Sequence, residues 1–97
     1  MNKVQETKPY LEEANKIHQH HIDLLIEMRH LCGFTQNIAA EELSIERSDL
    51  TRYENNNIHM SLVRFIRFRF VYYHYIMEHN IEISAKMRKL EALCNPF

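Results

Sequence analysis

Residues 35–56, TQNIAAEELSIERSDLTRYENN, contain the pattern that decides the expected fold. The pattern predicts two helices of about eight residues each, the first capped by Thr35 and the second covering about 46–54. The residues expected to face inward are Ile38, Ala39, Ala40, Leu43, Ile45, Leu50 and Tyr53. Helices this short are not stable alone, so we expect them to pack on neighbouring segments.

Helical spacing also covers the segment before this pair. Apolar residues recur at three- and four-residue steps from Pro9 to Cys32, and Gly33 is suited to end the helix in a left-handed conformation. The expected inward positions are Leu11, Ala14, Ile17, His21, Leu24, Leu25 and Met28. The pattern leaves open whether this is one long helix or two, broken near residues 18–21.

The segment after the pair predicts two more helices. Ser61 can cap a helix that extends to Met77. Its first apolar stripe is Phe65, Phe68, Tyr72, Tyr75 and Ile76, and its second is Phe70, Tyr73 and Met77. The alternating Arg-Phe residues also fit a strand, but the length of the segment and the lack of hairpin signals favour a helix. A break near Asn80 precedes a last helix with Ile83, Met87, Leu90 and Leu93.

Composition agrees with a single all-α domain of about five helices. The chain has 97 residues, of which 45% are hydrophobic, with one Gly and two Pro. So few turn residues disfavour an all-β fold, and a single Gly excludes a glycine-rich phosphate loop. No apolar run is long enough to span a membrane, and residues 1–10 lack the apolar stretch of a signal peptide. Cys32 and Cys94 form no CxxC pair, which is typical of a reducing compartment, so we expect a cytoplasmic protein.

The net charge of −1 hides an uneven distribution. Residues 1–43 hold four basic and seven acidic side chains, whereas residues 44–75 hold five basic and three acidic ones. All five of those basic residues are arginine, the side chain best suited to phosphates and guanine edges. The excess is small, so charge alone indicates nucleic-acid binding only weakly.

Residues 35–56 resemble the helix-turn-helix of the phage-repressor family, the Cro and cI-like or XRE-type DNA-binding domains. The matching positions are Thr35, Gln36, Ala40, Ile45, Glu54, Asn55 and Asn56, and the likeness extends over residues 22–71. It implies a lambda-repressor-like fold and an ion pair between Arg29 and Glu54. The chain differs from the family's usual residues at Ala39, Asn56, Met60 and Arg69. Because Ala39 is small, Ile38 or Phe34 would have to fill the core in its place.

The resemblance also implies a binding surface for double-stranded DNA. The helix around residues 46–54 would lie in the major groove with its N-terminal side chains at base edges. The implied DNA contacts are Gln36, Glu46, Arg47, Ser48, Thr51, Arg52, Asn55 and Asn57. Among these, Arg47 can form two hydrogen bonds with guanine.

The resulting hypothesis is a transcriptional regulator, expected to be a repressor. It would act as a homodimer through the aromatic outer face of the fourth helix and the helix of residues 84–94, with residues 80–97 as a dimer contact and residues 1–8 as a disordered arm. The alternative is a protein-interaction module with weak or no DNA binding, such as an antitoxin or phage adaptor. The acidic N-terminal third and the surplus of aromatic residues favour that alternative.

No catalytic constellation is visible, so we expect neither an enzyme nor a cofactor. His18, His20 and His21 suggest a metal site, but zinc would need further ligands that the nearby sequence does not offer. Solvated or core histidines are the preferred interpretation, and no metal is expected. Cys32 and Cys94 are interpreted as unreactive packing residues.

Overall fold

The computed structural model describes residues 9–94, and within that range it contains five helices and no strand. The helices are α1 (Pro9–Cys32), α2 (Gln36–Leu43), α3 (Arg47–Glu54), α4 (Leu62–Glu78) and α5 (Ala85–Cys94). This confirms the all-α fold class. The arm expected at residues 1–8 and the last three residues, 95–97, lie outside the described part of the chain.

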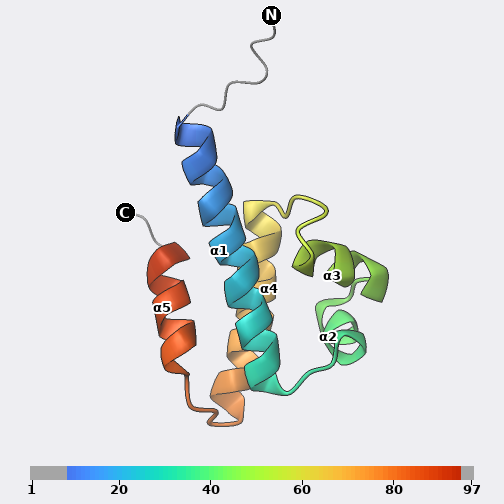
Figure 1. The fold of residues 1–97 in the computed structure, drawn as a ribbon. Helices are drawn as coiled ribbons and strands as arrows, with labels where there is room; N and C mark the ends of the chain where they lie inside the picture. The colour runs from blue at the N-terminus through green and yellow to red at the C-terminus, as the bar shows by residue number, and fades with distance from the viewer. Residues whose placement is uncertain (1–8, 95–97) are drawn as a thin grey trace, which may run out of the picture.

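α1 is the central element of the fold. It lies between α5 on one side and α4 on the other, with α2 and α3 beyond them (Figure 1). α1 is one continuous helix, which settles the question of a break near residues 18–21. Its first turns project past the other helices (Figure 1). Leu11 and Ala14 are therefore exposed, and their expected inward position was wrong because no helix covers that end of α1.

α4 supplies the largest buried side chains. Phe65, Phe68, Tyr72 and Ile76 are buried at three- and four-residue steps, and Tyr75 is half-buried. This is a helical stripe, so the alternative of a strand is wrong. The hydroxyl of Ser61 accepts a hydrogen bond from the backbone N–H of Arg64 at 3.1 Å, which confirms the predicted cap.

Left-handed residues separate the short helices. Gly33, Ser44, Asn56 and Asn80 have φ values of 73°, 58°, 58° and 52°. Glycine adopts this conformation freely, as the sequence predicts for Gly33, and asparagine tolerates it. Ser44 lacks that advantage, but it ends α2 with its own N–H donating to the carbonyl of Glu41 at 3.1 Å.

One of the two residues expected to compensate for the small Ala39 lies in the core. Phe34 is buried and lies edge-on to Tyr75, with ring centroids 4.6 Å apart. Ile38, the other residue expected to fill this space, is exposed. It lies one position before the buried pair Ala39 and Ala40, and a shift of one residue turns its side chain away from the core.

α5 packs along α1 and leaves the outer side of α4 uncovered. The carboxylate of Glu27 on α1 accepts a hydrogen bond from Ser84 at 3.2 Å and lies 3.5 Å from the ammonium of Lys86. Met87 is fully buried, and Arg69 on α4 donates to Glu91 on α5 at 3.0 Å. The ion pair explains how an arginine fits where the resembled family has a small core residue.

No helix among residues 9–94 combines the length and apolarity that a membrane crossing requires. Cys32 and Cys94 are both buried, and burial raises the pKa of each thiol to about 11. Because the thiolate is the reactive form, both side chains are poor nucleophiles at neutral pH.

Candidate nucleic-acid interface

A bidentate ion pair between Arg29 and Glu54 holds the C-terminal end of α3 against α1. Nε of Arg29 donates to Oε2 of Glu54 at 2.7 Å, and Nη2 donates to Oε1 at 2.9 Å. Nη1 of the same guanidinium donates to the carbonyl of Phe34 at 2.9 Å. The two charged side chains are only 11% and 9% exposed. The expected pair is therefore present and occupies a partly buried position that fixes where α3 ends.

Gln36 extends this network to the start of α2. Its Nε2 donates to Oε1 of Glu54 at 3.0 Å. Its Oε1 accepts from the hydroxyl of Thr51, which lies 2.9 Å away. The same hydroxyl lies 3.0 Å from the carbonyl of Arg47, so its single proton is already used inside the protein. Gln36 and Thr51 thus lock α2 and α3 together, and Thr51 has little freedom to bind a base.

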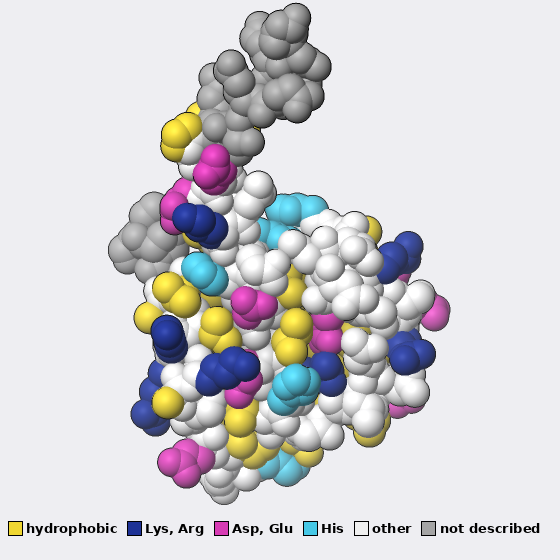
Figure 2. Space-filling view, viewed as in Figure 1, with side chains coloured by type: hydrophobic (Ala, Val, Ile, Leu, Met, Phe, Trp, Pro, Cys, Tyr) yellow, Lys and Arg dark blue, Asp and Glu magenta, His cyan; other side chains and the backbone are white. Residues whose placement is uncertain are grey.

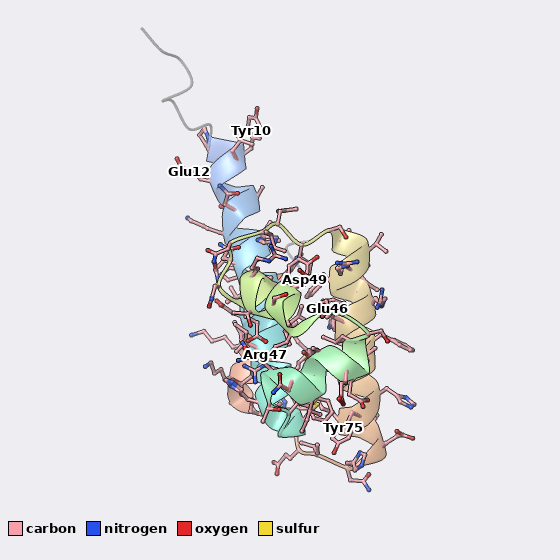
Figure 3. All side chains as sticks on the ribbon, turned by 90° about the vertical axis from the view of Figure 1, so that its right-hand side faces the viewer. Tyr10, Glu12, Glu46, Arg47, Asp49 and Tyr75 are labelled. Atoms are coloured by element: carbon pink, nitrogen blue, oxygen red, sulfur yellow. The ribbon has the colours of Figure 1, made fainter. Side chains whose placement is uncertain are left out.

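The N-terminal end of α3 faces away from the body of the protein. Leu50 and Tyr53 are buried on its inner side, whereas Glu46, Arg47 and Ser48 are exposed. Figure 3, which looks onto α2 and α3, labels Glu46, Arg47 and Asp49 in this region. Arg47 forms no ion pair with any side chain of residues 9–94. Its guanidinium is available for an external partner.

The second arginine of α3 is in a different position. Arg52 pairs with Asp49 one turn earlier on the same helix. An external phosphate would have to compete with that carboxylate. Asn55 and Asn57, two further implied contacts, are exposed immediately after α3. Among the implied contacts, Glu46, Arg47, Ser48, Asn55 and Asn57 are therefore the most accessible, while Gln36, Thr51 and Arg52 already have internal partners.

The loop after α3 is held against α1 by contacts that the sequence did not predict. Nε2 of His18 accepts a hydrogen bond from the N–H of Met60 at 3.0 Å, and its ring stacks on His59 with centroids 4.3 Å apart. Asn56 donates to the side chain of Gln19 at 2.9 Å. Burial lowers the pKa of His18, and the neighbouring His59 lowers it further. His59 is 41 positions from His18 in the chain, so no local spacing indicates their contact.

A second histidine of α1, His21, also has a packing partner. The ring of His21 stacks on Phe65 with centroids 4.0 Å apart, and burial lowers its pKa. Within the described residues, no group of three or more His, Cys, Asp or Glu side chains is arranged to hold a metal ion.

Charge around α2 and α3 is mixed. Glu41 and Glu42 on α2 are exposed, and so is Glu46, which precedes Arg47 in the chain. On the right-hand side of Figure 2, where α2 and α3 lie, basic and acidic side chains both reach the surface. The candidate interface therefore has one unpaired arginine and no continuous basic patch on this face.

Comparisons with known proteins identified no relative of this chain. No protein-family model matches the chain, and no curated protein or solved structure matches it.

Proposed function

We propose that this protein binds double-stranded DNA with α3 in the major groove. The observation that carries the proposal is the arrangement of α3: its C-terminal end is anchored by Arg29 and Glu54, while its exposed N-terminal end offers Arg47. A recognition helix reads base edges from its N-terminal residues, and it needs a rigid attachment so that they stay in register. The likeness of residues 35–56 to phage-repressor domains supports the same function.

Each accessible residue has a role in this proposal. Arg47 donates two hydrogen bonds to a guanine edge, Ser48 contacts a neighbouring base, and Glu46 accepts from cytosine. The first N–H groups of α2 face a phosphate, and the second amide proton of Gln36 donates to the same group. Asn55 and Asn57 contact the DNA backbone, which positions the helix without reading sequence.

The resemblance supports a lambda-repressor-like domain that acts as a repressor in the cytoplasm. Such a regulator reads a near-palindrome as a homodimer, with half-sites about 34 Å apart. The acidic residues beside Arg47 predict modest affinity, because binding strength depends on the number of cationic contacts to phosphate.

The decisive experiment is selection from a random duplex library, followed by binding of the selected duplex to variants. We expect Arg47→Ala to weaken binding by about 1–3 kcal/mol without altering the fold. Arg88→Ala is the matched control, because Arg88 is also an exposed arginine and lies on α5. Failure to enrich any sequence, or equal affinity of the Arg47→Ala protein and the wild type, would contradict the proposal.

The second candidate function is a protein-interaction module with weak or no DNA binding. It is favoured by the acidic residues around Arg47 and by the apolar outer side of α4. A library selection without enrichment, together with a stable complex with another protein, would support this alternative.

A further inference from the structure

The outer side of α4 carries a regular row of apolar side chains, of which four are exposed and one, Tyr73, is half-buried. Val63, Ile66, Phe70, Tyr73 and Met77 follow one another at steps of three, four, three and four residues. Val63, Phe70 and Met77 are 78%, 73% and 65% exposed. We call these five residues the α4 seam. A strict alternation of three and four is the spacing of a coiled-coil contact, so the seam suits another helix.

No helix of the described residues covers Val63, Ile66, Phe70 or Met77. α5, the remaining candidate, packs along α1 instead. In Figure 3, α4 forms the right-hand edge of the fold and no helix lies beyond it. A shallow groove of about 380 Å³ runs along the seam from Ile66 to Met77. An uninterrupted apolar row of this kind usually marks an interaction surface.

We propose that the seam binds the seam of a second copy of this chain, with the two α4 helices antiparallel. Antiparallel coiled-coil packing about a two-fold axis places Phe70 against Tyr73 of the second copy, and Ile66 against Met77 of the second copy. A two-fold contact is self-complementary, so each pairing occurs twice. Four apolar layers then form from one helix and need no other segment of the chain.

Charges beside the seam favour this partner and this direction. On the side of α4 that faces α2, Arg67 lies towards the N-terminal end, where it donates to the carbonyl of Leu43 at 2.6 Å. Glu42 and Glu78 lie on the same side of α4, beside Phe70 and His74. An antiparallel copy brings its Glu78 towards Arg67 and its Arg67 towards Glu78. A parallel copy would turn its Glu78 to the opposite face of the helix pair, so this attraction would be absent.

The antiparallel arrangement also fits the position of α3. A two-fold axis along the viewing direction of Figure 3 reverses α4 and leaves α2 and α3 of both copies on the side that faces the viewer. Pairing of the two seams buries on the order of 1,000 Å² of accessible surface, which is at the low end for a specific complex. We therefore expect a dimer that dissociates on dilution. The proposed pairing does not require DNA binding, and its test is made without DNA.

The first test is sedimentation of the full chain over a range of concentrations. Phe70→Glu should raise the dissociation constant by about a hundredfold or more, because a buried aromatic residue dominates such a contact and both copies lose it. Leu93→Glu is the matched control, an exposed apolar residue on α5 that should leave the dimer intact. Both substituted positions are exposed, so circular dichroism should show an unchanged helical fold.

The second test reads the direction of the helices. Ile66→Cys and Met77→Cys proteins, mixed, should be joined by a short bismaleimide crosslinker. Ile66→Cys alone should not be joined, because two such residues lie about 16 Å apart along an antiparallel pair at 1.5 Å per residue. Cys32 and Cys94 are buried, so the wild type serves as the unreactive control.

The expected results support the proposal only in combination. A wild-type dimer lost in Phe70→Glu, kept in Leu93→Glu and crosslinked only in the mixture supports the antiparallel seam. If the wild type were a monomer at high micromolar concentration, the proposed pairing would be overturned, and the seam would instead be a site for a different protein. Loss of the dimer in Leu93→Glu but not Phe70→Glu, or crosslinking of Ile66→Cys with itself, would overturn it as well.

Discussion

Two ion pairs on the same short helix differ in what they do for the protein. Glu54 on α3 pairs with Arg29 on α1, and the side chains are 9% and 11% exposed. Asp49 on α3 pairs with Arg52 on the same helix, and those side chains are 34% and 53% exposed. The first pair connects distant parts of the chain and the second connects residues three positions apart. Burial and chain separation, more than the chemistry of the charges, separate an anchor from a surface contact.

The consequence for a binding surface is that the anchor should govern stability and the unpaired Arg47 should govern DNA binding. A buried pair costs desolvation, but removal of one member leaves an uncompensated charge. A surface pair contributes little in either direction.

The largest effect is expected from Arg29→Ala. The substitution leaves the carboxylate of Glu54 without its ion-pair partner and removes the hydrogen bond to the carbonyl of Phe34. We expect a loss of about 3–5 kcal/mol in the free energy of unfolding, measured by chemical denaturation. Base preference should change less than the melting temperature does. Normal melting with an altered sequence preference would show that Arg29 acts on DNA and not as an anchor.

A smaller effect is expected from Thr51→Val, which keeps the shape of the side chain and removes its hydroxyl. The side-chain oxygen of Gln36 then loses its donor, so stability should fall by about 1 kcal/mol in denaturant titrations. Ser48→Ala is the control, since Ser48 is exposed on the same helix. If Thr51→Val left stability intact and changed base preference, Thr51 would belong to the DNA surface as the resemblance implies.

Acidification tests two histidines of α1, of which His18 holds the loop after α3 and His21 stacks on Phe65. Burial lowers the pKa of both His18 and His21 below the ordinary value of 6.5. The unfolded chain therefore takes up protons first as the pH falls. Stability should be fully present above pH 6.5 and should decline below it, until the pH passes the folded-state values. Thermal melts between pH 7.5 and about 5 measure this decline.

His18→Gln provides the comparison for the acid effect. It removes one titrating group, and its side chain can still accept from the N–H of Met60. The decline in melting temperature below pH 6.5 should become shallower in this variant. An unchanged slope would mean that other groups cause the acid sensitivity.

The smallest effect is expected from Arg52→Ala. Loss of an exposed pair three residues apart should change stability by about 0.5 kcal/mol or less, in contrast with Arg29→Ala. Salt should weaken even this small effect, because exposed charges are screened. A cost comparable to that of Arg29→Ala would remove the distinction between the two pairs.

Local chemistry made most of the helix boundaries predictable. Thr35 accepts a hydrogen bond from the N–H of Ile38, and Ser61 does the same for Arg64. Both caps depend on residues only three positions away, so a sequence pattern contains them. The pair of Arg29 and Glu54 was predictable for another reason, namely the resemblance to a family in which such a pair occurs.

Errors arose where a residue's environment comes from another element. Ile38 and Leu11 are apolar and fit helical spacing, yet no neighbouring helix covers them. The sequence indicates that Thr51 is a surface residue, whereas in the structure its hydroxyl donates to the side chain of Gln36. The contact between His18 and His59 joins α1 to a loop that is distant in sequence.

The sequence by itself determined five helices, the caps Thr35 and Ser61 and the left-handed Gly33, because backbone preferences and capping act over three or four residues. The tertiary structure alone decided which apolar residues are covered, which arginines have partners, and that the α4 seam stays open. Those properties depend on which helix lies beside which, and that is set by packing across the whole chain.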